Sequence, residues 1–403
     1  LIRKVVGGRL RPENEDDEDD GDDDLTIAAM GRPQSSMMIA PDLLVAAPSF
    51  NDFLTTEVTE IIDECRKANA RYKDPFSEHG KYDWGCTAIS QKSSSSSSSW
   101  WPPFSSSSSA SSSKKEIRPT KPAKAFSLFS PSGPKPEDIE QGKLGDCWFL
   151  SAISVLAHRH PKLIESLFLT EDVNAEGVFA VKFWRDGVWT PFIIDSYFPM
   201  SKHKTFQLAR CKDNTSLWVA VMEKAYAKMK GTYESLDLGS CDEAFCDLTG
   251  LPCFSLRNCA DETNAVNEGR WNEDDTFLIL MSYVSAGCTI GALCGGEEER
   301  VQVAEMIGLH SNHAYSVLDV ALDPSSNEHV ILLRNPWGTT DFAGQKVAIP
   351  AKTGGGGGSS SGKKQHKLTQ CDHDPGAFWM NFSLFTECFH RVDVCLTRQY
   401  DAN

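Results

Sequence analysis

Residues 141–150 read QGKLGDCWFL, and this stretch decides how the rest of the chain is interpreted. The segment Cys147–His158 (CWFLSAISVLAH) is apolar on almost every side, which predicts a fully buried helix. Two glycines permit a tight backbone just before it, and Asp146 is a natural N-cap residue, so Cys147 falls in the first turn. The positive end of a helix dipole, helped by a nearby cation, lowers the pKa of a thiol there. A packing role is expected for most of the thirteen cysteines, but this position predicts a nucleophile at Cys147.

The partners that a thiol nucleophile needs are also present. Gln141 stands six residues before Cys147, where its amide can join the Cys147 backbone N–H in stabilising the oxyanion of a tetrahedral intermediate. His313 stands directly before a strand-like run (NHAYSVLDV), and Asn335 stands at the end of the next one (LLRNPWG). A hairpin of those strands would bring the two side chains together, so that Asn335 orients the imidazole base and the following Pro-Trp pair shields their bond from water.

The composition excludes several classes of protein. The 403 residues carry a net charge of −16, but ten acidic residues lie in Glu13–Asp24, and the rest of the chain carries only about −6. The imbalance therefore belongs to a tail, and a nucleic-acid binder is disfavoured. No signal peptide opens the sequence, no CxxC pair occurs, and the longest apolar run, Phe277–Val284, is too short to span a bilayer. We therefore expect a cytoplasmic protein with free thiols and no membrane span.

Three stretches have compositions that cannot form a core. Residues 1–47 combine the acidic run with a Pro/Ser/Met-rich connector, so we expect a disordered tail. Serine runs at about 92–115 and a Gly/Ser run at about 353–364 are expected to be flexible insertions. Between the tail and the first insertion, Phe53–Tyr72 has the pattern of an amphipathic helix, and Asn51 is expected to cap its start.

The remaining sequence is helical in its first half and β-rich in its second. Leu217–Lys230 predicts a helix that stops at a glycine, and Val178–Trp184 with Val188–Ile194 predicts a hairpin that turns at Asp-Gly. Helices followed by strands indicate an α+β fold rather than a doubly wound one. Short apolar runs bounded by turn residues predict the strands of the second half: Thr276–Val284, Ala314–Ala321, His329–Leu333, Ala377–Met380 and Arg391–Leu396.

Together, QGKLGDCWFL, HAYSVLDV and RNPWG closely resemble the protease core of the calpains, which are papain-like cysteine endopeptidases. Further segments extend the resemblance, in family order, over residues 61–398. The resemblance implies a papain-like core of two subdomains, a helical one at residues 48–250 and a β-rich one at residues 251–400, with the active site in the cleft between them. The serine-rich and glycine-rich stretches are then insertions relative to compact members of the family.

The resemblance also assigns roles to individual residues. It implies that Cys147 and Gln141 lie on the first subdomain, and that His313 and Asn335 lie on the second. Trp337 matches the tryptophan that wedges the cleft in inactive forms of the family. No organic cofactor is implied.

Calcium is the one cofactor that the resemblance implies, with one site in each subdomain. Such a hard cation needs several oxygen ligands. Gly133 and Asp138 match ligand positions of the first site, but Ser216 stands where an acidic ligand is expected. At the second site Asp341 replaces a glutamate, and the acidic pair expected around Gly376 is missing. We therefore expect activity that calcium stimulates only at high concentration, or that is independent of calcium. The alternative is that Glu223 or nearby backbone carbonyls compensate for the missing ligands.

The interpretation that we favour is an active thiol endopeptidase with protein substrates. Cys147 and His313 would form an ion pair, the thiolate would attack a peptide carbonyl, and water would resolve the acyl-enzyme. The main alternative is a non-catalytic calpain-like scaffold that binds partners through its cleft or tails; such proteins commonly lose a triad residue, and none is lost here. A transglutaminase-like acyl transfer is disfavoured because those families surround the cysteine differently. The sequence identifies no regulatory partner.

Overall fold

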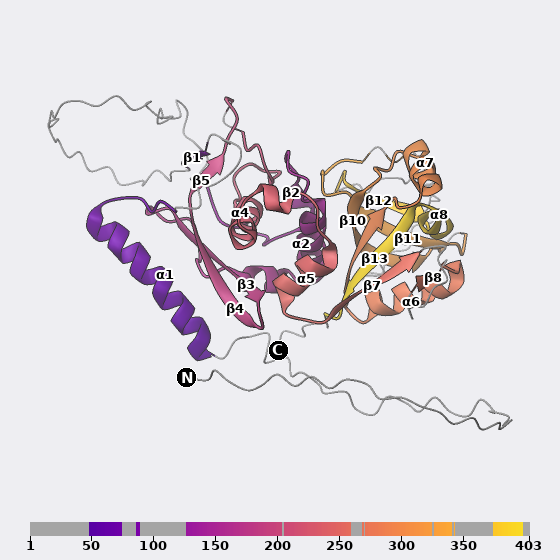
Figure 1. Ribbon diagram of the computed structural model, residues 1–403, viewed down its shortest axis with the longest axis horizontal. Helices are drawn as coiled ribbons and strands as arrows, with labels where there is room; N and C mark the ends of the chain where they lie inside the picture. Colours follow the sequence, from indigo (N-terminus) through magenta and orange to yellow (C-terminus); the bar gives the residue numbers. More distant parts are fainter. Residues whose placement is uncertain are drawn as a thin grey trace, which may run out of the picture. The chain divides into compact units, whose positions relative to one another are not determined.

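The computed structural model describes residues 48–74, 86–88, 126–203, 205–258, 268–269, 271–324, 326–340, 342 and 374–397 (Figure 1). The tail predicted at 1–47, the insertions predicted at about 92–115 and 353–364, and Asp341 lie outside these residues. In the described ranges no helix is long and apolar enough to cross a membrane.

The first half of the described chain consists of helices, one long antiparallel hairpin and several short strands. Helices α2 (Cys147–Arg159) and α4 (Trp218–Lys230) confirm the two predicted helices. Strands β3 (Val178–Arg185) and β4 (Val188–Asp195) pair in antiparallel register and confirm the predicted hairpin. The other elements of this half are α1 (Pro48–Ala68), β1 (Cys86–Ala88), η3 (Pro136–Asp138), β2 (Ile139–Glu140), α3 (Pro161–Leu167), β5 (Tyr197–Pro199), β6 (Arg210–Cys211), η4 (Glu234–Leu236) and α5 (Cys241–Thr249).

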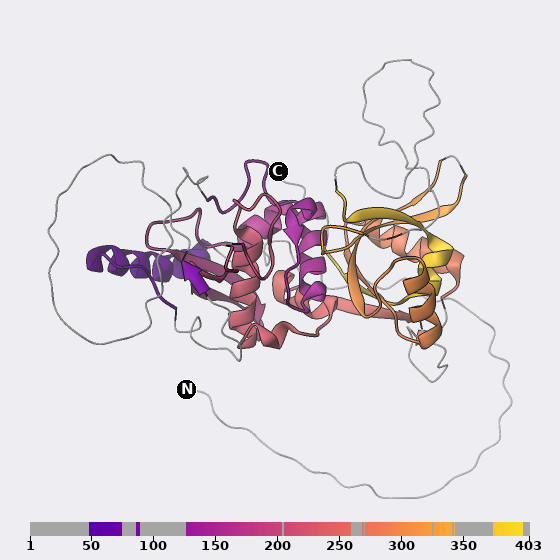
Figure 2. The same cartoon turned by 90° about the horizontal axis from the view of Figure 1, so that it is seen from above.

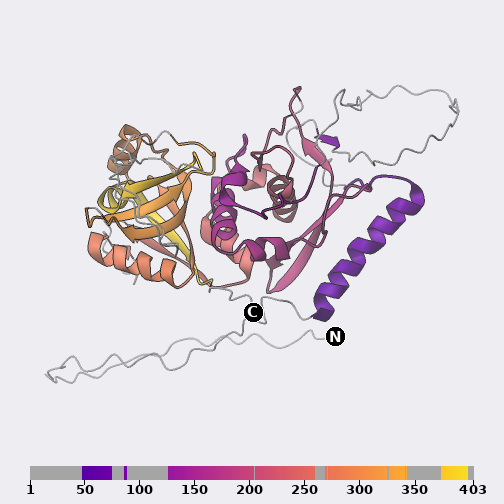
Figure 3. The same cartoon turned by 180° about the vertical axis from the view of Figure 1, so that it is seen from behind.

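Helix α1 begins earlier than the sequence predicted. It starts at Pro48, so Asn51 lies inside the helix and the predicted cap at that residue is wrong. Proline suits the first position of a helix, because its fixed φ is already helical and its missing N–H would have no partner there. Further along, Val58 is buried against Val178 and Ala180 of the hairpin, which attaches α1 to the outer side of β3 and β4 (Figure 3).

A seven-stranded sheet forms the second half, in the order β12-β11-β10-β9-β13-β7-β8. The neighbours pair in antiparallel fashion except for β7 and β8, which are parallel. Four of the five predicted strands are confirmed as β10 to β13. The elements of this half are β7 (Cys253–Asn258), β8 (Glu268–Gly269), α6 (Glu273–Ser285), β9 (Thr289–Cys294), α7 (Glu298–Met306), β10 (His313–Leu322), β11 (His329–Arg334), β12 (Ala377–Asn381), α8 (Phe382–Cys388) and β13 (Phe389–Cys395).

The strand predicted at Thr276–Val284 is wrong, because this segment lies in helix α6. Asn272 caps the helix by accepting a hydrogen bond from the Asp275 N–H at 3.1 Å. The buried side chains include Phe277, Leu280 and Val284, which recur at the spacing of one helix face. A short continuous apolar run does not by itself distinguish a strand from a helix. Here the Asn272 cap at the start of the segment favours the helix.

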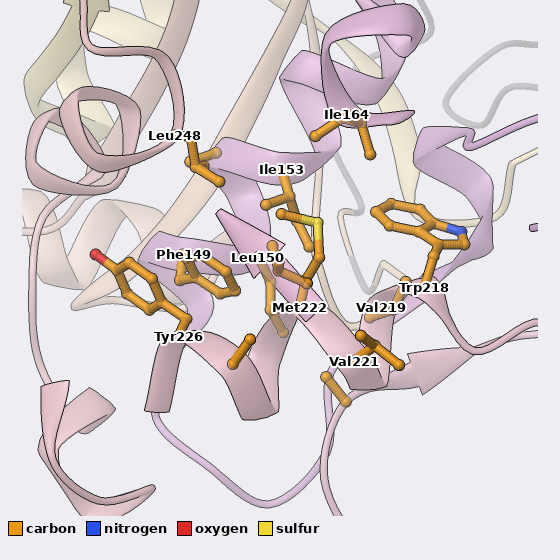
Figure 4. Packing of buried hydrophobic residues seen from close by; sticks show 14 of the residues in the cluster. Phe149, Leu150, Ile153, Ile164, Trp218, Val219, Val221, Met222, Tyr226 and Leu248 are labelled. Atoms are coloured by element: carbon orange, nitrogen blue, oxygen red, sulfur yellow. The ribbon is translucent and has the colours of Figure 1, made fainter. Parts of the chain in front are cut away.

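Two large clusters of buried apolar side chains fill the described part of the chain. The first joins α2 to α4, and Figure 4 shows its centre, where the rings of Phe149 and Tyr226 stack with their centroids 4.1 Å apart. The second cluster is made by the sheet with α6 and α8, and includes Phe277 and Phe382. Each large apolar side chain buried in this way contributes about 1.5–3 kcal/mol to stability.

Strand β10 connects the two clusters because successive side chains of a strand point to opposite faces. Ala314 and Leu318 join the first cluster, whereas Tyr315 joins the second. On the first face, Ser151 of α2 donates to the Ala314 carbonyl at 2.9 Å, and Ser316 donates back to the Ser151 carbonyl at 3.0 Å. Helix α2 therefore lies directly against β10 (Figure 2), which brings the start of the helix close to the start of the strand.

Candidate active site

Cys147 is the first residue of α2, at the end of the helix that meets β10. The helix begins here because the Asp146 carbonyl accepts the N–H groups of Phe149 and Leu150, at 3.0 and 3.1 Å. The Cys147 sulfur lies against the strand, where the Ala314 N–H donates to Sγ at 3.5 Å. The thiol is therefore held at a helix N-terminus and beside the residue that follows His313 in sequence.

The pKa of the Cys147 thiol is raised from its ordinary value, mainly by burial. The Ala314 N–H lowers this pKa and the charge of Asp146 raises it, but neither outweighs the loss of solvent. This direction is opposite to the lowering that we predicted from the helix dipole together with a nearby cation. A thiolate at this position consequently needs a neighbouring cation to stabilise it.

His313 and Asn335 meet because strands β10 and β11 form an antiparallel hairpin. His313 is the first residue of β10, and Asn335 directly follows the last residue of β11. Their side chains are joined by a hydrogen bond of 2.8 Å between His313 Nε2 and Asn335 Oδ1. Because an amide oxygen can only accept, Nε2 carries the proton and Nδ1 keeps its lone pair, which makes Nδ1 the basic atom of the ring. Burial lowers the pKa of His313 to about 4, so the imidazole is neutral at rest.

Trp337 covers this pair, in line with the shielding that the sequence suggested. Its ring centroid lies 4.9 Å from that of His313 and 4.1 Å from that of His310. Its backbone N–H donates to Asn335 Oδ1 at 3.0 Å, so the amide oxygen accepts from both the ring and the loop. The tryptophan itself remains 41% exposed, and it forms part of the wall of a cavity.

A cavity of about 740 Å³ is lined by Cys147, His313 and Trp337, and Asn335 lies behind them, bonded to His313. Gln141 also lines it, but its Nε2 donates to the Leu144 carbonyl at 2.7 Å. Its backbone N–H donates to the Pro336 carbonyl at 2.9 Å, which ties this segment to the loop after β11. The cavity is lined by Gln141, Gly142, Lys143, Leu144, Gly145, Cys147, Leu238, Glu305, Gly308, Leu309, His310, Ser311, Asn312, His313 and Trp337.

Asp146 occupies the N-cap position of α2, but its side chain does not cap the helix, so that part of the prediction is wrong. The carboxyl is fully buried. It lies instead against the buried carboxyl of Glu223 on α4, whose Oε1 accepts the Ala209 N–H at 2.9 Å. Two buried carboxyls in contact can be accommodated only if they share a proton. The sequence suggested Glu223 only as an alternative calcium ligand and did not predict its contact with Asp146, because the two residues are distant along the chain.

Because Asp146 and Glu223 share a proton, we expect Glu223→Gln to change the pH dependence of thermal stability. Burial raises the pKa of Asp146 to about 7 and that of Glu223 well above its ordinary value, while the charge of Asp237 raises the Asp146 pKa further. The folded protein therefore holds more protons than the unfolded chain, and this contribution to stability is lost as pH rises through 7. Glutamine keeps the acceptor for Ala209 and offers a donor to Asp146. We expect a Tm close to wild type at pH 5 and about 3 °C higher at pH 8.5.

Thermal unfolding of both proteins over this pH range measures the effect. Glu223→Leu serves as the control: it leaves the Ala209 N–H without its acceptor, so it should lower the Tm at both pH values. An unchanged pH profile in Glu223→Gln would show that the pair holds no shared proton.

Arg334 is a second site-adjacent residue that the sequence analysis did not single out. It ends β11, directly before Asn335, and is completely buried. Its Nε pairs with Asp374 Oδ2 at 2.7 Å, and its Nη2 donates to the Ile139 carbonyl at 2.9 Å. The only sequence signal was a charged residue inside an apolar strand pattern (VILLRN). Arg334 thus anchors the loop that carries Asn335 to the segment before Gln141.

Of the residues that the resemblance implied as calcium ligands, the structure describes Gly133 and Asp138, and both accept hydrogen bonds from the protein. Asp138 Oδ2 accepts the Lys135 N–H at 3.0 Å and the Trp218 indole N–H at 3.3 Å, and the Gly133 carbonyl accepts the Ser130 hydroxyl at 3.0 Å. One carboxylate and one carbonyl fall well short of the six to eight oxygens that calcium takes. Among the described residues there is also no group of three His, Cys, Asp or Glu side chains that could hold a metal ion. Asp341 lies outside those residues.

Comparison with known proteins identifies similar sequences. Residues 92–396 match the model of a family described as calpain family cysteine protease. A calpain of Schistosoma mansoni is 32% identical over 290 residues, which cover 70% of this chain and 35% of that protein. The calpain-type cysteine protease DEK1 of Arabidopsis thaliana is 31% identical over 264 residues, which cover 64% of this chain and 11% of that protein. The human calpain-2 catalytic subunit is 27% identical over 368 residues, which cover 85% of this chain and 45% of that protein. The chain therefore spans less than half the length of each of these three relatives.

Proposed function

Because the chain belongs to the calpain family of cysteine proteases, we propose that it is an endopeptidase that cleaves protein substrates through Cys147, His313 and Asn335. The observation that carries the proposal is that Cys147 and His313 line one cavity and that the 2.8 Å bond from His313 Nε2 to Asn335 leaves Nδ1 free to act as a base. Cysteine peptidases need this combination of nucleophile, base and orienting group.

The proposed reaction proceeds through an acyl-enzyme. His313 Nδ1 takes the proton of the Cys147 thiol, and the thiolate attacks the carbonyl carbon of the scissile peptide. The Cys147 backbone N–H and the Gln141 amide stabilise the oxyanion, for which Gln141 exchanges its bond to Leu144 for one to the substrate. His313 then protonates the leaving amine, and water, deprotonated by the same imidazole, hydrolyses the thioester.

The electrostatics of the site support ionisation of the two groups as a pair. Burial raises the pKa of the Cys147 thiol and lowers that of His313, so each group alone is neutral. Moving the proton from sulfur to nitrogen creates two opposite charges together, and each then stabilises the other. Asn335 favours the imidazolium through its bond to Nε2, since that bond raises the pKa of His313.

We further propose that the core has the papain-like architecture of two subdomains, at residues 48–250 and 251–400, with the site in the cleft between them. Two large apolar clusters support this arrangement. The cavity supports it too, because residues from both halves of the chain line it. In it Trp337, which stands 41% exposed at the cavity wall, acts as the residue that narrows the cleft.

Labelling with an electrophilic peptide tests the proposal against a non-catalytic scaffold. A peptide bearing a thiol-reactive group should modify Cys147, identified by mass spectrometry, while the exposed Cys246 stays unmodified at the same dose. The same preparation should cleave unfolded casein. Selective labelling without any cleavage would favour the scaffold, and equal labelling of both cysteines would remove the case for an activated thiol.

We propose that calcium is not required for activity, or acts only at high concentration. The reason is that Asp138 already accepts two N–H groups, and that no group of three His, Cys, Asp or Glu side chains among the described residues could hold a metal ion. We expect cleavage of a quenched peptide in excess chelator, and calorimetric titration with calcium should show binding no tighter than about 10⁻³ M.

Asp138→Asn is the matched variant for this experiment, because it removes the carboxylate charge and keeps the size of the side chain. Its response to calcium should equal that of the wild type. Activity that vanishes in chelator and returns at about 10⁻⁵ M calcium would contradict the proposal.

A further inference from the structure

Leu238 combines three features that do not normally occur together in a leucine. It lies in the segment between η4 and α5, with its side chain 90% exposed. Its φ is +80°, in the left-handed region where a side chain strains the backbone. It also lines the cavity that contains Cys147 and His313. Exposed apolar side chains are common, but a strained one at the wall of a candidate active site calls for a function.

The backbone around Leu238 is held firmly, so the side chain cannot turn away from the cavity at little cost. Asp237 Oδ1 accepts the Gly145 N–H at 2.8 Å, and the Leu238 N–H reaches the Gly145 carbonyl at 3.4 Å. On the other side, the Trp148 indole donates to the Leu236 carbonyl at 2.9 Å. A Cβ on Gly239 would lie 2.3 Å from the Trp148 ring, so the chain runs flat against that tryptophan. These contacts attach the segment to Gly145, two residues before Cys147, and to Trp148, the residue after it.

We infer that Leu238 determines specificity by forming the wall of a subsite for an apolar substrate side chain. The inference rests on the proposed endopeptidase function and names a substrate preference for it. A peptide whose carbonyl reaches Cys147 must pass the segment fastened to Gly145, and its nearby side chains then meet Leu238. An apolar side chain in that place removes both its own surface and that of Leu238 from water, whereas a charged one gains nothing there.

The expected size of the preference follows from the contact. Pockets that differ by a methylene or two of apolar contact discriminate by 10–200-fold, so we expect about a 10-fold preference in kcat/KM at one substrate position. Glycine at 238 should abolish this preference without lowering the Tm, because glycine adopts a positive φ without strain.

Cleavage profiling of a peptide mixture tests the inference. Wild type, Leu238→Gly, Leu238→Met and Leu238→Asp are compared, with Leu322→Asp as the matched control, since Leu322 is 44% exposed at the far end of β10 from His313. We expect wild type, Leu238→Met and the control to share the apolar preference. Leu238→Gly should lose it, and Leu238→Asp should favour lysine or arginine at the same position. Identical profiles in wild type and Leu238→Asp would overturn the inference.

Failure of the proposed function would be seen separately, as no cleavage by any of these proteins. The inference is then decided by equilibrium binding of apolar and basic versions of one peptide to wild type and Leu238→Asp. Weaker binding of the apolar peptide to Leu238→Asp supports the subsite, and equal binding overturns it.

Discussion

Replacing Cys147 with alanine is expected to abolish peptide-bond cleavage, with a fall in kcat/KM of at least about 10⁴-fold. The sulfur is the atom that bonds to the substrate carbonyl, and alanine offers no substitute. The fold should persist, because the sulfur accepts only from backbone N–H groups, such as that of Ala314 at 3.5 Å, and fills little of the core. Quenched-peptide kinetics together with thermal unfolding measure both effects.

The remaining members of the site should follow in a graded series. His313→Ala should be nearly as inactive, whereas Asn335→Ala should keep part of the activity, since it orients the base and does not itself react. Cys246→Ala is the control, because this exposed cysteine on α5 does not line the cavity. Wild-type rates of casein cleavage by Cys147→Ala would refute the protease assignment.

Arg334→Met is expected to cause the largest loss of stability, about 3–5 kcal/mol. The guanidinium is completely buried and pairs with Asp374 at 2.7 Å, so its removal leaves a buried carboxylate without its cation. The Ile139 carbonyl also loses its donor. For a chain of this size the loss corresponds to a fall in Tm of about 10 °C. Peptidase activity should fall with it, because Asn335 follows Arg334 directly.

Arg185→Met provides the matched control for this substitution. Arg185 is half exposed and pairs at 3.5 Å with the almost fully exposed Asp186, so its loss should cost about 0.5 kcal/mol or less. The double variant Arg334→Met with Asp374→Leu should recover part of the stability, because no buried charge is then left unpaired. If Arg334→Met and Arg185→Met unfold at the same temperature, the buried pair is not the anchor described above.

The elements that the sequence predicted correctly are those whose signals are local. The all-apolar segment after Asp146 could only be a buried helix, and it is α2. Asp186 and Gly187 both have positive φ, which is the turn that an Asp-Gly pair between apolar runs indicates. His313 and Asn335 could be expected to meet because two adjacent strands of a hairpin bring their loops to one end. These inferences need only a few neighbouring residues and the geometry of one turn or one helix.

The remaining features depended on residues that are far apart in the chain. The Asp146 carboxyl faces Glu223 rather than the helix N-terminus, and the pKa of the Cys147 thiol is raised rather than lowered. Arg334 is buried because Asp374 and Ile139 come together around it. Burial and pairing energies are sums over all contacts that the fold creates, and no local pattern contains them. The sequence by itself therefore determined which residues could react, whereas only the tertiary structure decided their charge states, their supports and the wall that a substrate meets.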